Sequence, residues 1–332
     1  MRERESLNKI YSPDIPDFFA EFSKAPAMQR IKRVGMHCGC EYTSFPLFEG
    51  LSEYSRYEHS VGVGLITWRF TKDIKQAIAA LFHDIATPVF AHTIDFLNGD
   101  YITQESTENQ TESIIRNSEE IGILLKKYKL RAEDVIDYHI YPIADNEAPG
   151  LCADRLEYTL SNLINFCGGD LKKVKALYDD ICVAENEAGA FELSFRHLEK
   201  AAEFAFIALR CAKVYVADED RYSMQMLSEL VKDGIEKGVI TKKDLYTDEP
   251  KVLAKFENDE EMKSAWEKYC SYHKMLYGDE QKKAAVRYIQ AKKRLIDPFV
   301  AEVGRVSELD RDFAEAKEEF LGIKFDAPLS AI

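Results

Sequence analysis

A chain of 332 residues can bury a large core, either as one big domain or as two smaller ones. Its formal net charge of -14 opposes binding to nucleic-acid polymers, and no apolar run approaches the roughly 18 residues that span a membrane. The charged N-terminus lacks the apolar stretch of a signal peptide, and an odd number of cysteines indicates reduced thiols. We therefore expect a cytoplasmic protein that binds neither nucleic-acid polymers nor membranes.

Helical periodicity dominates the chain, because apolar residues recur at three- and four-residue spacing in many segments. The glycines Gly168 and Gly238 are typical stop signals after two of these segments. A charged stretch at 257–283 is expected to be a solvated, peripheral helical region. The helices that the pattern predicts cover residues 56–70, 72–83, 112–128, 151–166, 197–216 and 223–237.

Two segments are predicted to be extended. One follows Arg33 and runs through Phe45, and the other is 286–300, where KKRLIDPFV contains a proline that limits a helix. The chain is thus predicted to be mainly α, an all-α bundle with a few short strands. We expect residues 1–190 to form the core that carries the site, with a soft boundary near 165–190. Residues 191–332 are expected to form a C-terminal helical region packed on that core, with a strand element near 286–300.

The dipeptide His83-Asp84 ends a predicted apolar helix in AALFHDIATPVFAH. A charged pair against a buried face is costly without a partner. Adjacent helical side chains diverge by about 100°, so both can contact one ion only if other helices complete the shell. His59 and Asp154 lie on two further predicted helices and would supply the remaining ligands.

Two imidazoles and two carboxylates suit a divalent transition metal (Mn, Fe, Co, Ni or Zn) better than magnesium. Such a metal would polarise a phosphorus centre and lower the pKa of a bound water. The sequence HCGC, with His37, Cys38 and Cys40, suggests a different, soft-metal site. No second cysteine or histidine pair completes four ligands there, so ordinary thiols are the favoured interpretation.

Three sequence blocks, RYEHSVGV at 56–63, HDIATPVFAHTID at 83–95 and ADRLEYTL at 153–160, resemble the signature blocks of the HD superfamily of phosphohydrolases. The branch that they resemble most is that of the deoxynucleoside triphosphate triphosphohydrolases, which segments 25–34, 238–256 and 292–300 also resemble. The resemblance implies metal-dependent hydrolysis of a phosphate ester or anhydride in a small phosphorylated substrate, a nucleotide. Relatives are often oligomers, so a second copy of this chain is a candidate partner, although no segment of the sequence indicates an interface.

The resemblance also implies roles for individual residues. We expect catalytic roles for Asp84, His92 and Asp95, with His92 as a proton donor, since an imidazole can donate at neutral pH. Arg56 lies three residues before His59, on the same helical face. The residues at metal-binding positions are His59, His83, Asp84 and Asp154, and those at substrate-binding positions are Arg56, Arg155 and Tyr158.

Several positions depart from the motifs of that branch. Thr87 replaces a second histidine after the HD pair, and Asn109 and Gln110 stand where the branch has a histidine–glutamate pair, which leaves Asp95 without its usual partner. Met36, Ser161 and Asn162 replace residues linked to sugar recognition and to the motif around Tyr158. His139 has two interpretations, a contributor to the site or to a second metal, and an ordinary exposed or hydrogen-bonded histidine, which is favoured.

Three functions are compatible with these features. The leading hypothesis is an HD-type metal-dependent phosphohydrolase. The second is a non-catalytic HD module that binds metal and a nucleotide as a sensor or regulator, and the third is a scaffold whose HD residues are vestigial. Phosphate-binding GxxxxGK[ST] loops, dinucleotide-binding GxGxxG motifs and GxSxG nucleophile elbows are absent from the sequence.

Overall fold

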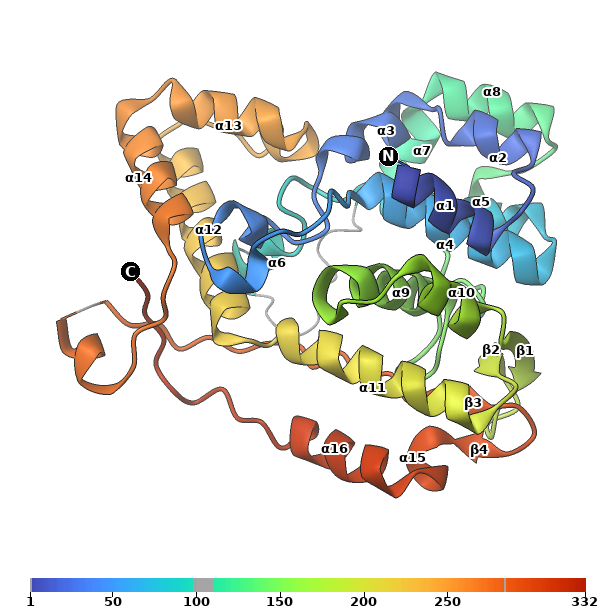
Figure 1. The fold of residues 1–332 in the computed structure, drawn as a ribbon. Coiled ribbons are helices and arrows are strands. Elements are labelled where there is room, and N and C mark those ends of the chain that lie inside the picture. Colours follow the sequence, from blue (N-terminus) through green and yellow to red (C-terminus); the bar gives the residue numbers. More distant parts are fainter. Residues whose placement is uncertain (1, 98, 100–109, 284) are drawn as a thin grey trace.

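The computed structural model describes residues 2–97, 99, 110–283 and 285–332 (Figure 1). Most of the described chain is helical, which confirms the predicted mainly α class, and a small sheet accompanies the helices. The helices are α1 (Arg2–Tyr11), α2 (Asp17–Phe22), α3 (Pro26–Arg30), α4 (Arg56–Thr71), α5 (Ile74–Phe82), α6 (Thr93–Leu97), α7 (Thr111–Asn117), α8 (Glu119–Lys127), α9 (Ala153–Cys167), α10 (Leu171–Tyr178), α11 (Leu198–Val214), α12 (Asp218–Glu236), α13 (Glu249–Glu257), α14 (Glu260–Ser271), α15 (Val306–Leu309) and α16 (Arg311–Leu321).

Helix α4 lies at the centre of the fold and packs against α1, α5 and α9 (Figure 1). It begins at a capping box in which Ser55 accepts a hydrogen bond from the backbone N–H of Glu58, while the Glu58 carboxylate accepts one from the Ser55 backbone. It ends at Lys72, which adopts a left-handed conformation with φ 52°. Because the helix is buried along most of its length, its orientation relative to α5 and α9 is fixed.

A close approach between α4 and α9 depends on a glycine. A Cβ atom at Gly62 would lie 2.5 Å from Cγ of Glu157, a contact that requires one side chain to move. The absence of a side chain at Gly62 therefore lets the Glu157 side chain pass close to α4, where it reaches His59. Helix α9 ends at Gly168 with φ 65°, as its sequence predicts.

The sheet has four strands in the order β1 (Ile181–Glu185), β2 (Phe191–Phe195), β3 (Phe299–Val300) and β4 (Gly304–Arg305). Strands β1 and β2 form an antiparallel hairpin, β2 and β3 pair in parallel, and β3 and β4 pair antiparallel. The sheet lies at one end of α11, and it joins the last part of the chain to the hairpin that follows α10 (Figure 1).

Two separate hydrophobic clusters support the fold. The larger contains apolar side chains from α1 to α5, α7 to α11, the sheet, α15 and α16. The second is formed by α12, α13 and α14 together with the segments 38–48 and 89–96. The segment around His92 therefore packs on α12, whereas His59 and Asp154 belong to helices of the larger cluster. The division into 1–190 and 191–332 stays a prediction.

Several predicted elements differ from the structure. The expected strand from 34 to 45 is wrong, since that segment contains a short 3-10 helix at Cys40–Tyr42 and one isolated bridge, Gly35 to Ser55. The single helix expected at 112–128 is two helices, because Ser118 caps α8 through a hydrogen bond from the Ile121 backbone. The hairpin of β1 and β2 was not predicted, and within 286–300 only β3 is a strand.

Other expectations hold. The predicted helices at 56–70, 72–83, 151–166, 197–216 and 223–237 correspond to α4, α5, α9, α11 and α12, with ends that shift by a few residues. The peripheral region at 257–283 is largely helical, although Met262, Trp266 and Tyr269 of α14 are buried in the second cluster. All seven cysteines are free thiols. Within the described ranges, no helix combines the length and the apolar character needed to cross a membrane.

Candidate metal centre and active site

Three side chains that can bind a metal meet where α4, α5 and α9 converge. His59 lies near the start of α4, His83 follows α5 directly, and Asp154 is the second residue of α9. Nε2 of His59 lies 2.8 Å from Oδ1 of Asp154, and Nε2 of His83 lies 3.8 Å from the same oxygen. One donor atom from each residue lies within 4.8 Å of the others. The structure therefore brings three of the four predicted ligands into one group.

The remaining ring nitrogens of both histidines contact hydrogen-bond acceptors. Nδ1 of His59 lies 2.6 Å from Oε2 of Glu157, and Nδ1 of His83 lies 2.8 Å from the carbonyl oxygen of Ala80. A carboxylate or a carbonyl can only accept, so these partners favour a proton on Nδ1 of each ring. In the neutral rings, Nε2 then carries the lone pair on the side that faces Asp154, which is the orientation a metal ligand needs.

The electrostatics of this group also fit a bound cation. Burial lowers the pKa of His59, but hydrogen bonds to Asp154 and Glu157 outweigh it and raise the pKa to about 10. Burial raises the pKa of Asp154, yet His59 and then His83 hold it below its usual range. The protonated imidazole thus neutralises the surrounding carboxylates, and a divalent cation that displaced this proton would do the same through the same atoms.

Glu157 contacts the metal-donor group, and the sequence interpretation did not assign it to the site. Its side chain is buried, and it accepts hydrogen bonds from Tyr54 and, over 2.8 Å, from Ser161 as well as contacting His59. It therefore orients the His59 ring rather than facing the cavity. The signal was its position three residues after Asp154 in ADRLEYTL, which places both carboxylates on one face of α9.

Asp84 adjoins the three donors but contacts them less closely. Its Oδ2 lies 3.5 Å from Nε2 of His83 and 3.1 Å from Nη1 of Arg56, and Thr87 donates a 2.6 Å hydrogen bond to its Oδ1. Burial raises the pKa of Asp84, but Arg56, followed by His83 and His59, holds it well below its usual range. Asp84 is therefore an ionised carboxylate beside the donors, and Thr87, which replaces a histidine of the related motif, fixes its rotamer.

His92 and Asp95 form a partly buried pair at the start of α6. Nδ1 of His92 lies 2.8 Å from Oδ2 of Asp95, whose side chain is fully buried. Burial lowers the pKa of His92, and Arg294 and Arg56 lower it further against the effect of Asp95. Asp95 lacks the usual histidine partner of the related branch, and His92 contacts it instead. The second ring nitrogen of His92 lies 3.5 Å from Nη2 of Arg294.

Arg155 and Tyr158 line the same cavity, but Arg155 is largely engaged by the protein. Its Nη1 donates to Oδ1 of Asn146 over 2.7 Å and to the carbonyl of Gly150 over 3.2 Å. The guanidinium therefore braces the loop before α9. Tyr158 packs edge-on against Tyr215, with ring centroids 6.2 Å apart, and burial raises the pKa of its hydroxyl.

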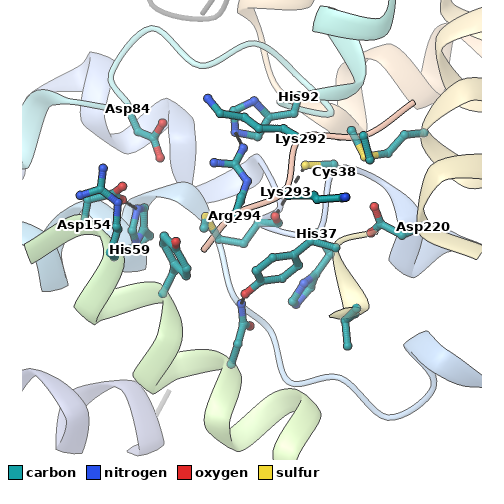
Figure 2. A pocket seen from close by; sticks show the side chains of 18 of the residues that line it. His37, Cys38, His59, Asp84, His92, Asp154, Asp220, Lys292, Lys293 and Arg294 are labelled. Carbon is teal, nitrogen blue, oxygen red and sulfur yellow. Dashed lines mark hydrogen bonds and ion pairs between the residues drawn. The ribbon is translucent and has the colours of Figure 1, made fainter. Parts of the chain in front are cut away.

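A cavity of about 510 Å³ connects these groups. Its metal-donor end is formed by His59, His83, Asp84 and Asp154, and Figure 2 shows Asp220 and His37 at the opposite end, with Arg294 between the two ends. Sequence interpretation did not assign Lys292, Arg294 or Asp220 to the site. Lys292 and Arg294 come from the extended segment after α14, whose resemblance to the related branch implied no role for single residues, and Asp220 comes from α12.

Some of the positions that depart from the related motifs lie at this cavity. Met36 and Asn162 line it, Ser161 donates to Glu157, and Asn162 donates a 2.6 Å hydrogen bond to the Tyr215 hydroxyl. Gln110 precedes α7 and is exposed, and Asn109 lies outside the described residues.

The two uncertain histidine motifs can also be placed. His139 is about half exposed, with Nδ1 3.0 Å from Asp137 and Nε2 3.7 Å from Asp145, so it is a hydrogen-bonded histidine at the rim of the cavity. The metal-donor groups found within the described residues do not include His37, Cys38 or Cys40. They do include a second group, Asp145, Cys152 and Asp154, in which Arg155 already contacts Asp145.

Comparison with known families agrees with this geometry. A family model for the HD domain matches residues 56–159, from the first residue of α4 to the middle of α9. The matched range contains every metal, catalytic and substrate-binding residue predicted from the sequence, as well as Glu157. The segment that carries Lys292 and Arg294 lies outside it.

Individual relatives extend the similarity beyond the HD domain. The uncharacterized protein YdhJ of Bacillus subtilis is 27% identical over 237 residues, which cover 70% of this chain and 69% of that protein. The metal-dependent phosphohydrolase cns2 of Cordyceps militaris is 26% identical over 116 residues, which cover 34% of this chain and 32% of that protein. These matches support a place for the chain in the HD superfamily of phosphohydrolases.

A solved structure shares the overall fold. The crystal structure of a phosphohydrolase from Bacteroides thetaiotaomicron superposes with a TM-score of 0.64 and covers 96% of each chain, at 14% sequence identity. The arrangement of the HD domain with its C-terminal helices is therefore a fold found in another protein, even though few residues are shared.

Proposed function

We propose that this protein is a metal-dependent phosphohydrolase that acts on a phosphate ester or anhydride of a nucleotide. The observation that carries the proposal is the convergence of His59, His83 and Asp154 at one end of a closed-in cavity, with both imidazoles oriented by acceptors on their outer nitrogens. Such a group is costly to bury unless a cation joins it.

His59, His83 and Asp154, with Asp84 beside them, would hold a divalent transition metal, because imidazole and carboxylate donors together suit such ions. A metal held there would activate water and polarise a phosphate group. Glu157 keeps the His59 ring in place, and Arg56 together with Thr87 keeps Asp84 in place. These contacts keep the protein's own contribution to the centre preorganised.

Arg56 and His92 would act on the substrate. Nε of Arg56 is buried and has no hydrogen-bond partner in the described part of the chain, so the guanidinium retains a donor for a phosphate oxygen. His92 is held by Asp95 through Nδ1, which leaves Nε2 on the cavity side. We assign His92, in its doubly protonated form, the transfer of the Nε2 proton to the leaving oxygen, which returns the ring to the neutral form with its proton on Nδ1.

The choice of a nucleotide is supported by other residues that line the cavity. Tyr158, Phe166 and Tyr215 provide aromatic surface in it. Oδ1 of Asn162 and Nε2 of His37 are buried without a hydrogen-bond partner in the described residues, so each can pair with a polar ring or a sugar. A cavity of about 510 Å³ is in the size range of small-molecule sites.

Metal analysis and a phosphate-release assay test this function together. Protein purified without chelator is measured for Mn, Fe, Co, Ni and Zn, and is then assayed with nucleoside mono-, di- and triphosphates. We expect about one metal per chain and phosphate release that His59→Ala abolishes and His273→Ala, a change at an exposed histidine, preserves. If metal binds and nucleotides stabilise the protein without any release of phosphate, the proposal is wrong and a binding role replaces it.

A further inference from the structure

An extended segment, residues 287–297, crosses from the second hydrophobic cluster to the sheet, and we call it the strap. Its backbone is tied down along its length. Arg287 pairs with Leu329 through two backbone hydrogen bonds, of 2.9 and 2.7 Å. Further along, Arg221 donates to the carbonyl of Ile289, and the backbone N–H of Asp297 donates to the carbonyl of Pro149 over 2.9 Å. The strap is therefore a fixed wall of the cavity, which residues 291–295 line.

Three successive cations in the strap alternate in direction. Side chains of an extended chain point to opposite sides in turn, so positions 292 and 294 share one side and 293 faces the other. Nζ of Lys293 accordingly donates to the carbonyl oxygens of Leu321 and Ile323, at the end of α16. Figure 2 shows Lys292 and Arg294 beside His92, whereas Lys293 extends away from it. The alternation thus directs two of the three charges to the cavity.

The charge of Arg294 shifts the pKa values of three other residues that line the cavity. It lowers the pKa of His92 in addition to the effect of burial, and it opposes the rise that burial causes in the pKa of Tyr158 and of Asp220. Those three residues come from α6, α9 and α12 or the turns beside them. Arg294 thus projects from the strap close to residues of three other elements that line the cavity.

Cations line the cavity beyond the metal donors. Arg56 contacts Asp84 beside those donors, Nη2 of Arg294 lies 3.5 Å from Nε2 of His92, and Lys292 lines the same cavity from the strap. In a chain of net charge -14, a cavity that concentrates cations on the wall facing a metal group is suited to an anion.

We propose that Lys292 and Arg294 form a phosphate-binding wall, which holds the part of the substrate that is remote from the metal donors and sets it against His92. This inference rests on the proposed function and adds to it two substrate-binding residues outside the HD domain. A phosphate oxygen bound by Arg294 would lie next to Nε2 of His92, because the two side chains are 3.5 Å apart. The wall therefore places the leaving oxygen beside the group that we assign as proton donor.

Calorimetric titration with inorganic phosphate and pyrophosphate tests the wall. Both anions are titrated into manganese-loaded and into metal-free protein, for wild type, Arg294→Met, Arg294→Lys and Lys292→Met. Arg311→Met is the control, since it removes the same charge from an exposed position of α16. We expect Arg294→Met to weaken pyrophosphate binding by about tenfold or more, as the loss of a charge-assisted hydrogen bond implies. Arg294→Lys should restore part of the affinity, and Arg311→Met should not change it.

A second measurement separates binding from a merely structural role. Because Arg294 lowers the pKa of His92, the His92 ring should titrate at higher pH in Arg294→Met and not in Arg311→Met, as followed by nuclear magnetic resonance. If Arg294→Met does not fold, the affinity of Lys292→Met for pyrophosphate decides whether the strap binds phosphate.

Equal affinity for pyrophosphate in wild type, Arg294→Met and Lys292→Met would overturn the phosphate-binding wall and leave metal-dependent hydrolysis intact. Weakened binding in these variants, combined with no phosphate release from any nucleotide by wild type, would overturn the proposed function alone.

Discussion

The aspartates at the two ends of the cavity have pKa values that are shifted in opposite directions. At the metal-donor end, Arg56 and the histidines keep Asp84 and Asp154 ionised, with pKa values below the usual range. At the far end, burial raises the pKa of Asp220 to about 8, although Arg294 partly opposes it. One end thus presents anionic oxygens that a cation can bind, and the other presents a neutral acid beside cationic side chains.

This contrast explains how one cavity in an acidic protein can take both a metal and a phosphorylated ligand. Carboxylates that remain charged are concentrated on α9 and after α5, where imidazoles share the site. The cations are Arg56, beside Asp84 at the metal-donor end, and Lys292 and Arg294 on the strap. Under the proposed function, the carboxylates would hold the metal, and a phosphate would lie between these cations, next to His92.

The largest effect is expected at the metal-donor end. Asp154→Ala removes the oxygen that both imidazoles approach, so the variant should lose stoichiometric metal and show only the phosphate release of metal-free protein. Elemental analysis and the phosphate assay measure both quantities. Asp179→Ala, at an exposed site after α10, is the matched control. Full metal content in Asp154→Ala would remove this residue from the centre.

A change at His92 should leave the metal in place. His92→Gln removes the proposed proton donor, and we expect kcat to fall by about 10²- to 10⁴-fold with an unchanged metal content. The pH dependence of kcat should also lose the limb that reports the His92 proton. A variant with wild-type kcat and pH profile would show that His92 does not transfer the proton.

A change at Glu157, which contacts the metal donor His59 from behind, should have a smaller effect. Glu157→Gln keeps an acceptor for Nδ1 of His59 but removes the charge, and we expect metal affinity to fall by about 10- to 100-fold. Competition with a fluorescent chelator gives the affinity, and circular dichroism checks that the helices are retained. Unchanged affinity would mean that Glu157 serves the fold and not the metal.

The smallest effect is a pH-dependent change in stability at the far end. The folded-state pKa of Asp220, about 8, lies above that of an ordinary aspartate, so the folded protein binds the extra proton between about pH 4 and pH 8. Wild-type stability should therefore fall as pH rises through this window, and Asp220→Asn should escape this loss. Between pH 5 and pH 8, the unfolding free energy of wild type should therefore fall by at least about 1 kcal/mol more than that of Asp220→Asn. Chemical denaturation at both values measures it, and parallel curves would contradict the raised pKa.

The metal-donor end could be foreseen from sequence because its residues lie in short blocks on strongly periodic helices. The HD pair after an apolar helix, and the carboxylate near the start of α9, carry their spacing in the sequence itself. The orientation of His59 by Glu157 could not be foreseen, since it depends on how closely Gly62 lets α9 approach α4. The interruption of the 112–128 helix at Ser118 was also hidden, because a serine cap competes with an otherwise continuous periodicity.

The far end could not be foreseen, because it is assembled by long-range contacts. The strap has no regular element of its own, and its path is set by hydrogen bonds to Leu329, Pro149 and the end of α16. Its cations were visible in KKRLIDPFV, but nothing in that sequence indicates which of them face His92. The hairpin of β1 and β2 was missed for a similar reason, since β2 pairs with β3, which lies more than 100 residues further along the chain.

Anomalous X-ray diffraction from crystals grown with manganese tests the central claim most directly. The account predicts one strong anomalous peak bound by His59, His83 and Asp154, at the end of the cavity that faces the strap. A peak held by other residues, or none in crystals of protein that binds manganese in solution, would contradict it.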